Sequence, residues 1–174
     1  MATIVLQPST SQAWQSAIIR RLCHSPFSHM DYVVPEGLLG ASDPGGVAIR
    51  PLNYQAFGIR RRAVITCSAD CWLRFDAAMR SQLGKPFDDK ALHAFLSDPD
   101  DEVSEARDWR SLDQWFCSEL IAWSLEQAGL WPFDLIIAKN HISPPDLLLL
   151  INPYIDTKSF WAPIPGLVLG ARER

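Results

Sequence analysis

Cys117 is the residue whose type and position best suit nucleophilic chemistry. It lies in the segment Trp115-Phe116-Cys117-Ser118-Glu119-Leu120, at the first turn of a helix that we predict over 117–127. The unpaired N–H groups and the positive dipole end of a helix N-terminus favour a thiolate over a thiol, and the thiolate is the nucleophilic form. The same N–H groups can hold an oxyanion. The alternative is a buried cysteine that fills a gap between Trp115, Phe116 and Leu120.

A thiol nucleophile also needs an imidazole base, and His29 is the histidine best placed to act as one. It opens a predicted strand over 29–34, where a rigid element can aim the ring. Asp31 follows two residues later, on the same face of the strand, and is a plausible partner to fix the imidazole tautomer. A structural histidine is the equally weighted alternative. The other three histidines lie in less suitable positions: His24, His93 and His141.

Two groups of segments together resemble a known family of thiol enzymes. The first group is Ser28-His29, Leu38 to Ser42 and Gly45-Gly46-Val47; the second is Gly84 to Asp88 and Phe116 to Leu120. The chain resembles the circularly permuted branch of the NlpC-type papain-like cysteine peptidases and amidases, the YiiX-like proteins. In that branch the histidine strand precedes the cysteine helix, as it does here. The resemblance is strongest over 25–128.

The resemblance implies a permuted papain-like fold, with Cys117 as nucleophile and His29 as general base. Family members cleave amide bonds, often in peptidoglycan peptides, and some relatives act on lipid acyl groups. We therefore expect a hydrolase that needs no cofactor, with a peptide, a peptidoglycan-like molecule or an acyl-bearing small molecule as substrate. A thiol acyltransferase or lipid-directed enzyme on the same fold, and a catalytically silent binding module, are the alternatives.

One departure from the family pattern concerns the third catalytic residue. The family often places a polar residue, commonly an acid, on the strand after the histidine and before an alanine. Here that position is Gly40, before Ala41, so Asp31 would have to orient the imidazole from the histidine strand itself. Trp115 and Trp123 are candidates for a substrate-binding wall, with burial in the core as the alternative.

The elements that must position these residues are predicted from hydrophobic periodicity and turn signals. Short strands joined by tight turns indicate an antiparallel meander or barrel-like sheet packed against helices, in a single α+β domain over 1–174. The predicted strands are 29–34, 38–42, 47–50 and 63–67. The predicted helices are 9–22, 69–83, 89–96, 117–127 and one that begins at Ser143-Pro144-Pro145-Asp146; Ser97 to Arg110 reads as a loop or lid.

Composition excludes several classes of protein. Of 174 residues, 48% are hydrophobic and 21% are charged, which is typical of a globular domain and not of a disordered or fibrous chain. The formal charge of −4 disfavours nucleic acid as a partner, because proteins that grip a phosphate backbone carry the opposite sign. We interpret the short basic run Arg60-Arg61-Arg62 as a solvated strand edge.

Metal binding, membrane insertion and secretion are also disfavoured. Cys23, Cys67, Cys71 and Cys117 lack the paired C-x2-C spacing of a zinc site, so we expect no metal and four reduced thiols. No apolar run approaches the roughly 18 residues that span a bilayer. Residues 1–20 do not have the pattern of a signal peptide. We therefore expect a cytoplasmic bacterial or phage protein, which would reach a cell wall only after lysis or on a carrier.

Overall fold

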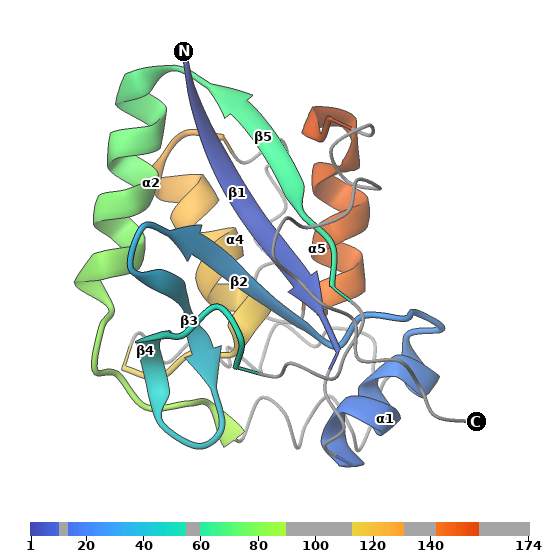
Figure 1. The fold of residues 1–174 in the computed structure, drawn as a ribbon. Coiled ribbons are helices and arrows are strands. Elements are labelled where there is room, and N and C mark those ends of the chain that lie inside the picture. Colours follow the sequence, from blue (N-terminus) through green and yellow to red (C-terminus); the bar gives the residue numbers. More distant parts are fainter. Residues whose placement is uncertain (11–13, 55–59, 90–112, 131–141, 157–174) are drawn as a thin grey trace, which may run out of the picture.

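A computed structural model describes residues 1–10, 14–54, 60–89, 113–130 and 142–156. In this part of the chain the fold is α+β, with an open five-stranded antiparallel sheet and helices packed against it (Figure 1). The sheet order is β4-β3-β2-β1-β5. The strands are β1 (Ala2–Ser9), β2 (His29–Val34), β3 (Gly37–Ser42), β4 (Gly46–Arg50) and β5 (Ala63–Cys67).

The sheet differs from the prediction in one of its inner strands. The sequence patterns do not predict β1, which lies between β2 and β5 and pairs antiparallel with both. The meander is therefore limited to β2, β3 and β4, and the sheet is open rather than barrel-like. The helix predicted over 9–22 begins only at Trp14, because Ser9 still belongs to β1 and pairs with His29. This helix is α1 (Trp14–Leu22).

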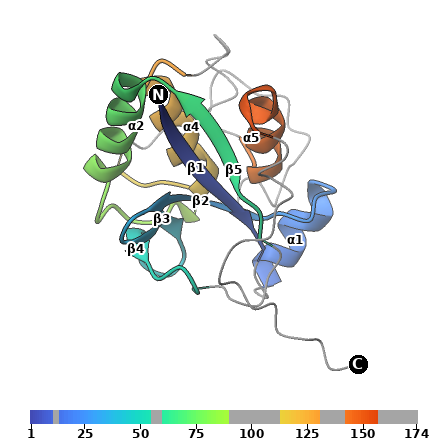
Figure 2. The ribbon, with the colours of Figure 1, turned by 45° about the horizontal axis from the view of Figure 1, so that its top comes forward.

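Two helices cover one face of the sheet. These are α2 (Ala69–Ser81) and α4 (Cys117–Gln127), which pack against each other; α2 contacts β1 and β3, and α4 contacts β2 and β3 (Figure 2). The side chain of Ser68 accepts a hydrogen bond from the N–H of Cys71 and so begins α2 as an N-cap. The predicted bounds of α4 are confirmed, whereas α2 ends two residues before the predicted Leu83.

The remaining described helices lie at the edges of this layer. α5 (Pro144–Ile151) packs against α4 and leads into a short 3₁₀ helix, η2 (Asn152–Tyr154). Its N-cap is Ser143, as the sequence predicts, and the hydroxyl accepts from the N–H of Asp146. The helix predicted over 89–96 and the loop or lid from Ser97 to Arg110 lie outside the described residues, apart from Asp89 itself.

The hydrophobic core lies between the sheet and the α2–α4 layer. Alternate residues of β2 enter it: Met30, Tyr32 and Val34 are all buried in the main cluster. The ring of Tyr32 packs edge-on against Phe75 of α2, and its hydroxyl donates to Asp76 of the same helix. Since successive side chains of a strand point to opposite faces, His29 and Asp31 point away from this core.

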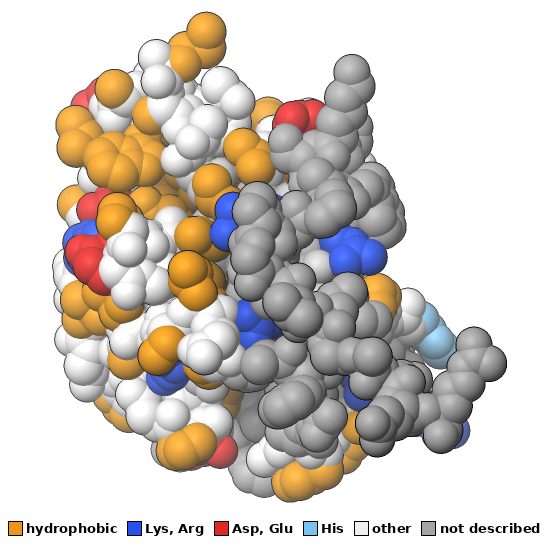
Figure 3. Space-filling view, viewed as in Figure 1, with side chains coloured by type: hydrophobic (Ala, Val, Ile, Leu, Met, Phe, Trp, Pro, Cys, Tyr) orange, Lys and Arg blue, Asp and Glu red, His pale blue; other side chains and the backbone are white. Residues whose placement is uncertain are grey.

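The surface of the described residues is mixed in character. In the view of Figure 1, basic and acidic side chains are scattered among apolar and neutral ones (Figure 3). None of the helices in the described part of the chain is both long and apolar enough to cross a membrane.

Candidate functional site

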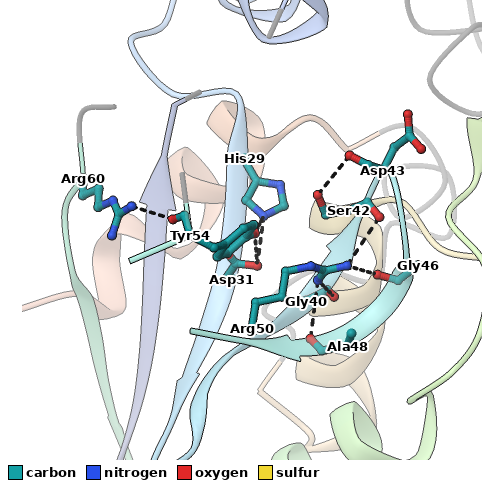
Figure 4. Close-up of polar contacts among 10 residues, drawn as sticks. All are labelled: His29, Asp31, Gly40, Ser42, Asp43, Gly46, Ala48, Arg50, Tyr54 and Arg60. Atoms are coloured by element: carbon teal, nitrogen blue, oxygen red, sulfur yellow. Dashed lines mark hydrogen bonds and ion pairs between the residues drawn. The ribbon is translucent and has the colours of Figure 1, made fainter. Parts of the chain in front are cut away.

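His29 and Asp31 form a buried pair at the beginning of β2. His29 is 8% exposed and Asp31 is fully buried. Nε2 of the imidazole lies 2.9 Å from Oδ1 of Asp31, a hydrogen-bond distance (Figure 4). The i, i+2 spacing of a strand brings the two side chains together, as the sequence predicts. Their roles in a reaction stay predictions.

The position that Gly40 occupies explains how Asp31 can approach the imidazole from the same strand. In the β2–β3 register, Tyr32 pairs with Leu39, so Gly40 lies next to Asp31. A Cβ atom built on Gly40 would lie 2.2 Å from Oδ1 of Asp31, closer than any real contact. The carboxylate of Asp31 therefore occupies the space that a side chain on β3 would need.

Tyr54 is a third member of this cluster, and sequence reasoning missed it. Its hydroxyl lies 2.7 Å from Nε2 of His29 and donates to the carboxylate of Asp31, at 2.9 Å from Oδ2 and 3.1 Å from Oδ1. Figure 4 shows the phenol directed at both residues. The residue follows β4 in a turn, where neither periodicity nor a motif marks it.

Two arginines hold Tyr54 in this position. The Arg50 guanidinium lies 5.5 Å from the centre of the Tyr54 ring and donates to the carbonyl oxygens of Gly40 and Gly46. The Arg60 guanidinium donates to the carbonyl oxygens of Leu52 and Tyr54, at 2.6 Å and 2.5 Å.

The interpretation of 60–62 as a solvated edge is therefore wrong for Arg60. Its side chain is 3% exposed and fixes the backbone of the turn that carries Tyr54. A charged run in a sequence does not reveal that carbonyl groups of a neighbouring turn will surround one of its members.

The electrostatic environment of His29 favours its charged form. Burial by itself lowers the pKa of the imidazole, but the charges of Asp31, Tyr54 and Cys117 and the hydrogen bond with Asp31 raise it. The net result is a pKa well above the ordinary value of 6.5. Cys117 is thus near enough to His29 to act on it electrostatically. Within the described residues, His29 is hydrogen-bonded to Asp31 and Tyr54 but not directly to Cys117.

Cys117 is the first residue of α4, and contacts on both sides fix it there. Before it, the N–H of Trp115 donates to the carbonyl of Pro86, and the N–H of Asp88 donates to the carbonyl of Trp115. After it, the hydroxyl of Ser118 donates to the carbonyl of Ile142 at 2.6 Å. These bonds hold the segment before the helix and its first turn against two distant parts of the chain.

The side chain of Cys117 is buried, with 1% exposed, in a small apolar cluster. The cluster contains Ile19 of α1 and Phe116, and Cys23 and Phe87 pack against it. The buried hydroxyls of Ser16 and Ser28, 2.5 Å apart, join α1 to the residue before His29. One side of the candidate site is therefore polar and the other apolar.

The positions of Trp115 and Trp123 favour burial in the core, the alternative to a substrate-binding wall. Trp115 is 3% exposed and belongs to the main core, where its indole N–H donates to Gln82. Trp123 is partly buried and packs against Trp115, with ring centres 5.2 Å apart. This burial does not support a role for either tryptophan in substrate binding, which stays a prediction.

The fold is similar to that of a solved protein. No protein-family model matches the chain, and no curated protein does so either. The crystal structure of the metalloprotein yiiX from Escherichia coli O157:H7, DUF1105, matches with a TM-score of 0.51 and 20% sequence identity. The match covers 98% of this chain and 92% of that one. The chain shares its fold with yiiX. The structural match agrees with the resemblance to YiiX-like proteins at the level of the fold.

Since yiiX is a metalloprotein, the donor groups of this chain bear on whether it could hold a metal ion as well. The described residues contain no group of three or more His, Cys, Asp or Glu side chains that could hold a metal ion. In the candidate site, Nε2 of His29 and both carboxylate oxygens of Asp31 are already hydrogen-bonded. Protein metal sites take at least three such ligands, so the residues described here do not fit a metal.

Proposed function

We propose that this protein is a thiol hydrolase of amide bonds with a permuted papain-like fold, in which Cys117 is the nucleophile and His29 the general base. The observation that supports this proposal is the buried hydrogen bond between His29 and Asp31, at 2.9 Å, together with the place of Cys117 at the N-terminus of α4. The charge of Cys117 is also among the causes that raise the pKa of His29. A nucleophile, a base and a group that orients the base are the minimum set for covalent acyl transfer.

The reaction follows from the ring nitrogens of His29. Asp31 accepts a hydrogen bond from Nε2–H of His29, so Nδ1 is the nitrogen that takes the proton from Cys117. Figure 4 shows Nδ1 directed away from Asp31. The thiolate attacks the scissile carbonyl, and the imidazolium returns the proton to the leaving amine as the C–N bond breaks. Water then attacks the thioester with His29 as base, releasing the acid and the free thiol. The oxyanion rests on the Cys117 N–H and a second donor.

A second candidate function is favoured by the apolar side of the site. Cys117 lies in an apolar cluster with Ile19 and Phe116, against which Phe87 packs. Such surroundings suit an acyl chain better than a polar peptide. An acyltransferase or lipid-directed hydrolase would form the same thioester but pass the acyl group to another acceptor or release it slowly. The two functions are separated by substrate: peptidoglycan peptides release an amine, whereas an acyl ester probe accumulates as a thioester that mass spectrometry detects.

The first experiment is the rate at which iodoacetamide alkylates Cys117 between pH 5 and pH 9, read by peptide mass spectrometry. Cys67, which is also buried, is the matched internal control, and Cys23 and Cys71 serve as partly exposed ones. We expect Cys117 to react at pH 6 about tenfold faster than Cys67, since an imidazolium partner stabilises a thiolate. In His29→Ala this advantage disappears.

The opposite outcome is equally informative. If Cys117 reacts no faster than Cys67 in wild type and His29→Ala leaves its rate unchanged, the thiol is not activated. The proposal of an enzyme then fails, and a catalytically silent binding module on this fold takes its place.

A further inference from the structure

We infer that Tyr54 is a positioning residue: with Asp31, it keeps the proton of neutral His29 on Nε2 and stabilises the charged imidazolium. The inference rests on the proposed function, because it concerns the base of the same site. It is carried by one geometric fact: a single hydroxyl lies within hydrogen-bond distance of Nε2 of His29 and of both oxygens of Asp31.

A phenol has one proton to donate, so the cluster has two arrangements. In the first, Tyr54 donates to Asp31 and Nε2–H of His29 donates to Asp31, which leaves the lone pair on Nδ1. In the second, Tyr54 donates to Nε2, and the neutral ring carries its proton on Nδ1. Only the first arrangement gives His29 a nitrogen that can accept the Cys117 proton.

The burial of Asp31 selects the first arrangement. A carboxylate with no exposed surface needs donors for its oxygens, and losing them costs about 1–3 kcal/mol or more. The second arrangement removes both donors from Asp31 at once. The first supplies one donor to each oxygen, at 2.9 Å in both cases.

In the first arrangement the phenol oxygen also faces the imidazole. Its lone pairs lie 2.7 Å from Nε2, so the Nε2–H is shared by two oxygen acceptors, one on Tyr54 and one on Asp31. Both acceptors stabilise the imidazolium. Among the residues that the structure describes, the other charged or titratable groups that act on the cluster are Cys117 from α4, Arg50 from β4 and Arg60 before β5.

The test uses Tyr54→Phe, which removes the hydroxyl and keeps the ring that packs under Arg50. Tyr32→Phe is the matched control, because its hydroxyl donates to Asp76 on the other face of the same sheet. Each variant is titrated by NMR of ¹⁵N-labelled histidine, and Cys117 alkylation is followed over the same pH range.

We expect the midpoint of the His29 titration to fall in Tyr54→Phe and to stay unchanged in Tyr32→Phe. Alkylation of Cys117 at pH 6–7 should drop by about threefold to tenfold in Tyr54→Phe, since the thiolate loses part of its counter-charge. If Tyr54 only supported the structure, the free energy of unfolding would fall in both variants, and the midpoint of the His29 titration would stay unchanged in both.

A wild-type measurement keeps the inference falsifiable if Tyr54→Phe does not fold. The ¹⁵N shifts of neutral His29 report its tautomer, and we expect Nε2–H. An Nδ1–H tautomer would overturn the inference, as would an unchanged His29 midpoint in a folded Tyr54→Phe. If that midpoint falls but His29→Ala leaves Cys117 alkylation unchanged, the positioning role stands and the hydrolase proposal fails.

Discussion

Gly40 and Asp31 compete for the same volume between β2 and β3. A methyl group on residue 40 would lie 2.2 Å from the Asp31 carboxylate, and the backbone carbonyl of Gly40 is held by Arg50. We therefore expect an acid on β2 and a side chain at position 40 on β3 to exclude each other. The glycine at position 40 is thus what leaves room for the buried acid on β2.

Gly40→Ala tests this exclusion. The added methyl group must displace the carboxylate, and we expect a loss of about 1–3 kcal/mol in the free energy of unfolding, as for other overpacked sites. Urea denaturation measures the loss, and Cys117 alkylation should fall with it because Asp31 no longer orients His29.

The control is the double-mutant cycle with Asp31→Ser, in which the smaller side chain leaves room for the methyl group. The two changes should couple by about 1 kcal/mol or more, in the sense that Gly40→Ala costs less in the Asp31→Ser variant than in the wild-type protein. Additive losses would show that the strain lies elsewhere.

How far the sequence predicts the site depends on how near the residues lie along the chain. His29 and Asp31 share a strand, and Cys117 begins a helix that apolar periodicity predicts, so local rules are enough to propose all three. Tyr54 reaches the pair from 23 residues beyond Asp31, through a turn fixed by Arg50 and Arg60. No local periodicity encodes such a contact, and only the folded backbone brings these groups together.

At the scale of the elements, β1 joins β5 to the rest of the sheet. It pairs with β2 and β5, and without it β5 has no partner in the sheet. The sequence rules predict β2 and β5 with their observed bounds but not β1. Its apolar residues Ile4 and Leu6 alternate as a strand requires. The patterns considered for this region, a signal peptide over 1–20 and a helix over 9–22, do not include a strand.

Leu6→Ala should therefore cost far more than its place near the N-terminus suggests. Leu6 is fully buried and pairs with both Tyr32 and Ala63. We expect a loss of about 2–5 kcal/mol in the free energy of unfolding, measured by urea denaturation. Thr3→Ala, on the exposed part of the same strand, should change it by no more than about 0.5 kcal/mol. Equal small effects would mean that β1 contributes little to the fold.

At the scale of the whole molecule, the buried His29–Asp31 pair makes the free energy of unfolding depend on pH. The folded protein holds the His29 proton more tightly than the unfolded chain, because its pKa is raised well above 6.5. Between these two pKa values the folded state binds more protons than the unfolded state, so stability falls as the pH rises. The contribution of the pair is complete below about pH 6.5 and is lost as the pH passes through the folded pKa.

His29→Gln isolates this contribution from the rest of the molecule. The difference in free energy of unfolding between wild type and His29→Gln should be largest at pH 6 and should shrink steadily toward pH 9, because only the wild type loses a favourable charge. His24→Asn, at an exposed histidine, is the matched control for the removal of an imidazole. If the His29→Gln difference does not vary with pH, His29 is not charged in the folded protein, and the imidazolium that the proposed mechanism places beside Cys117 is absent.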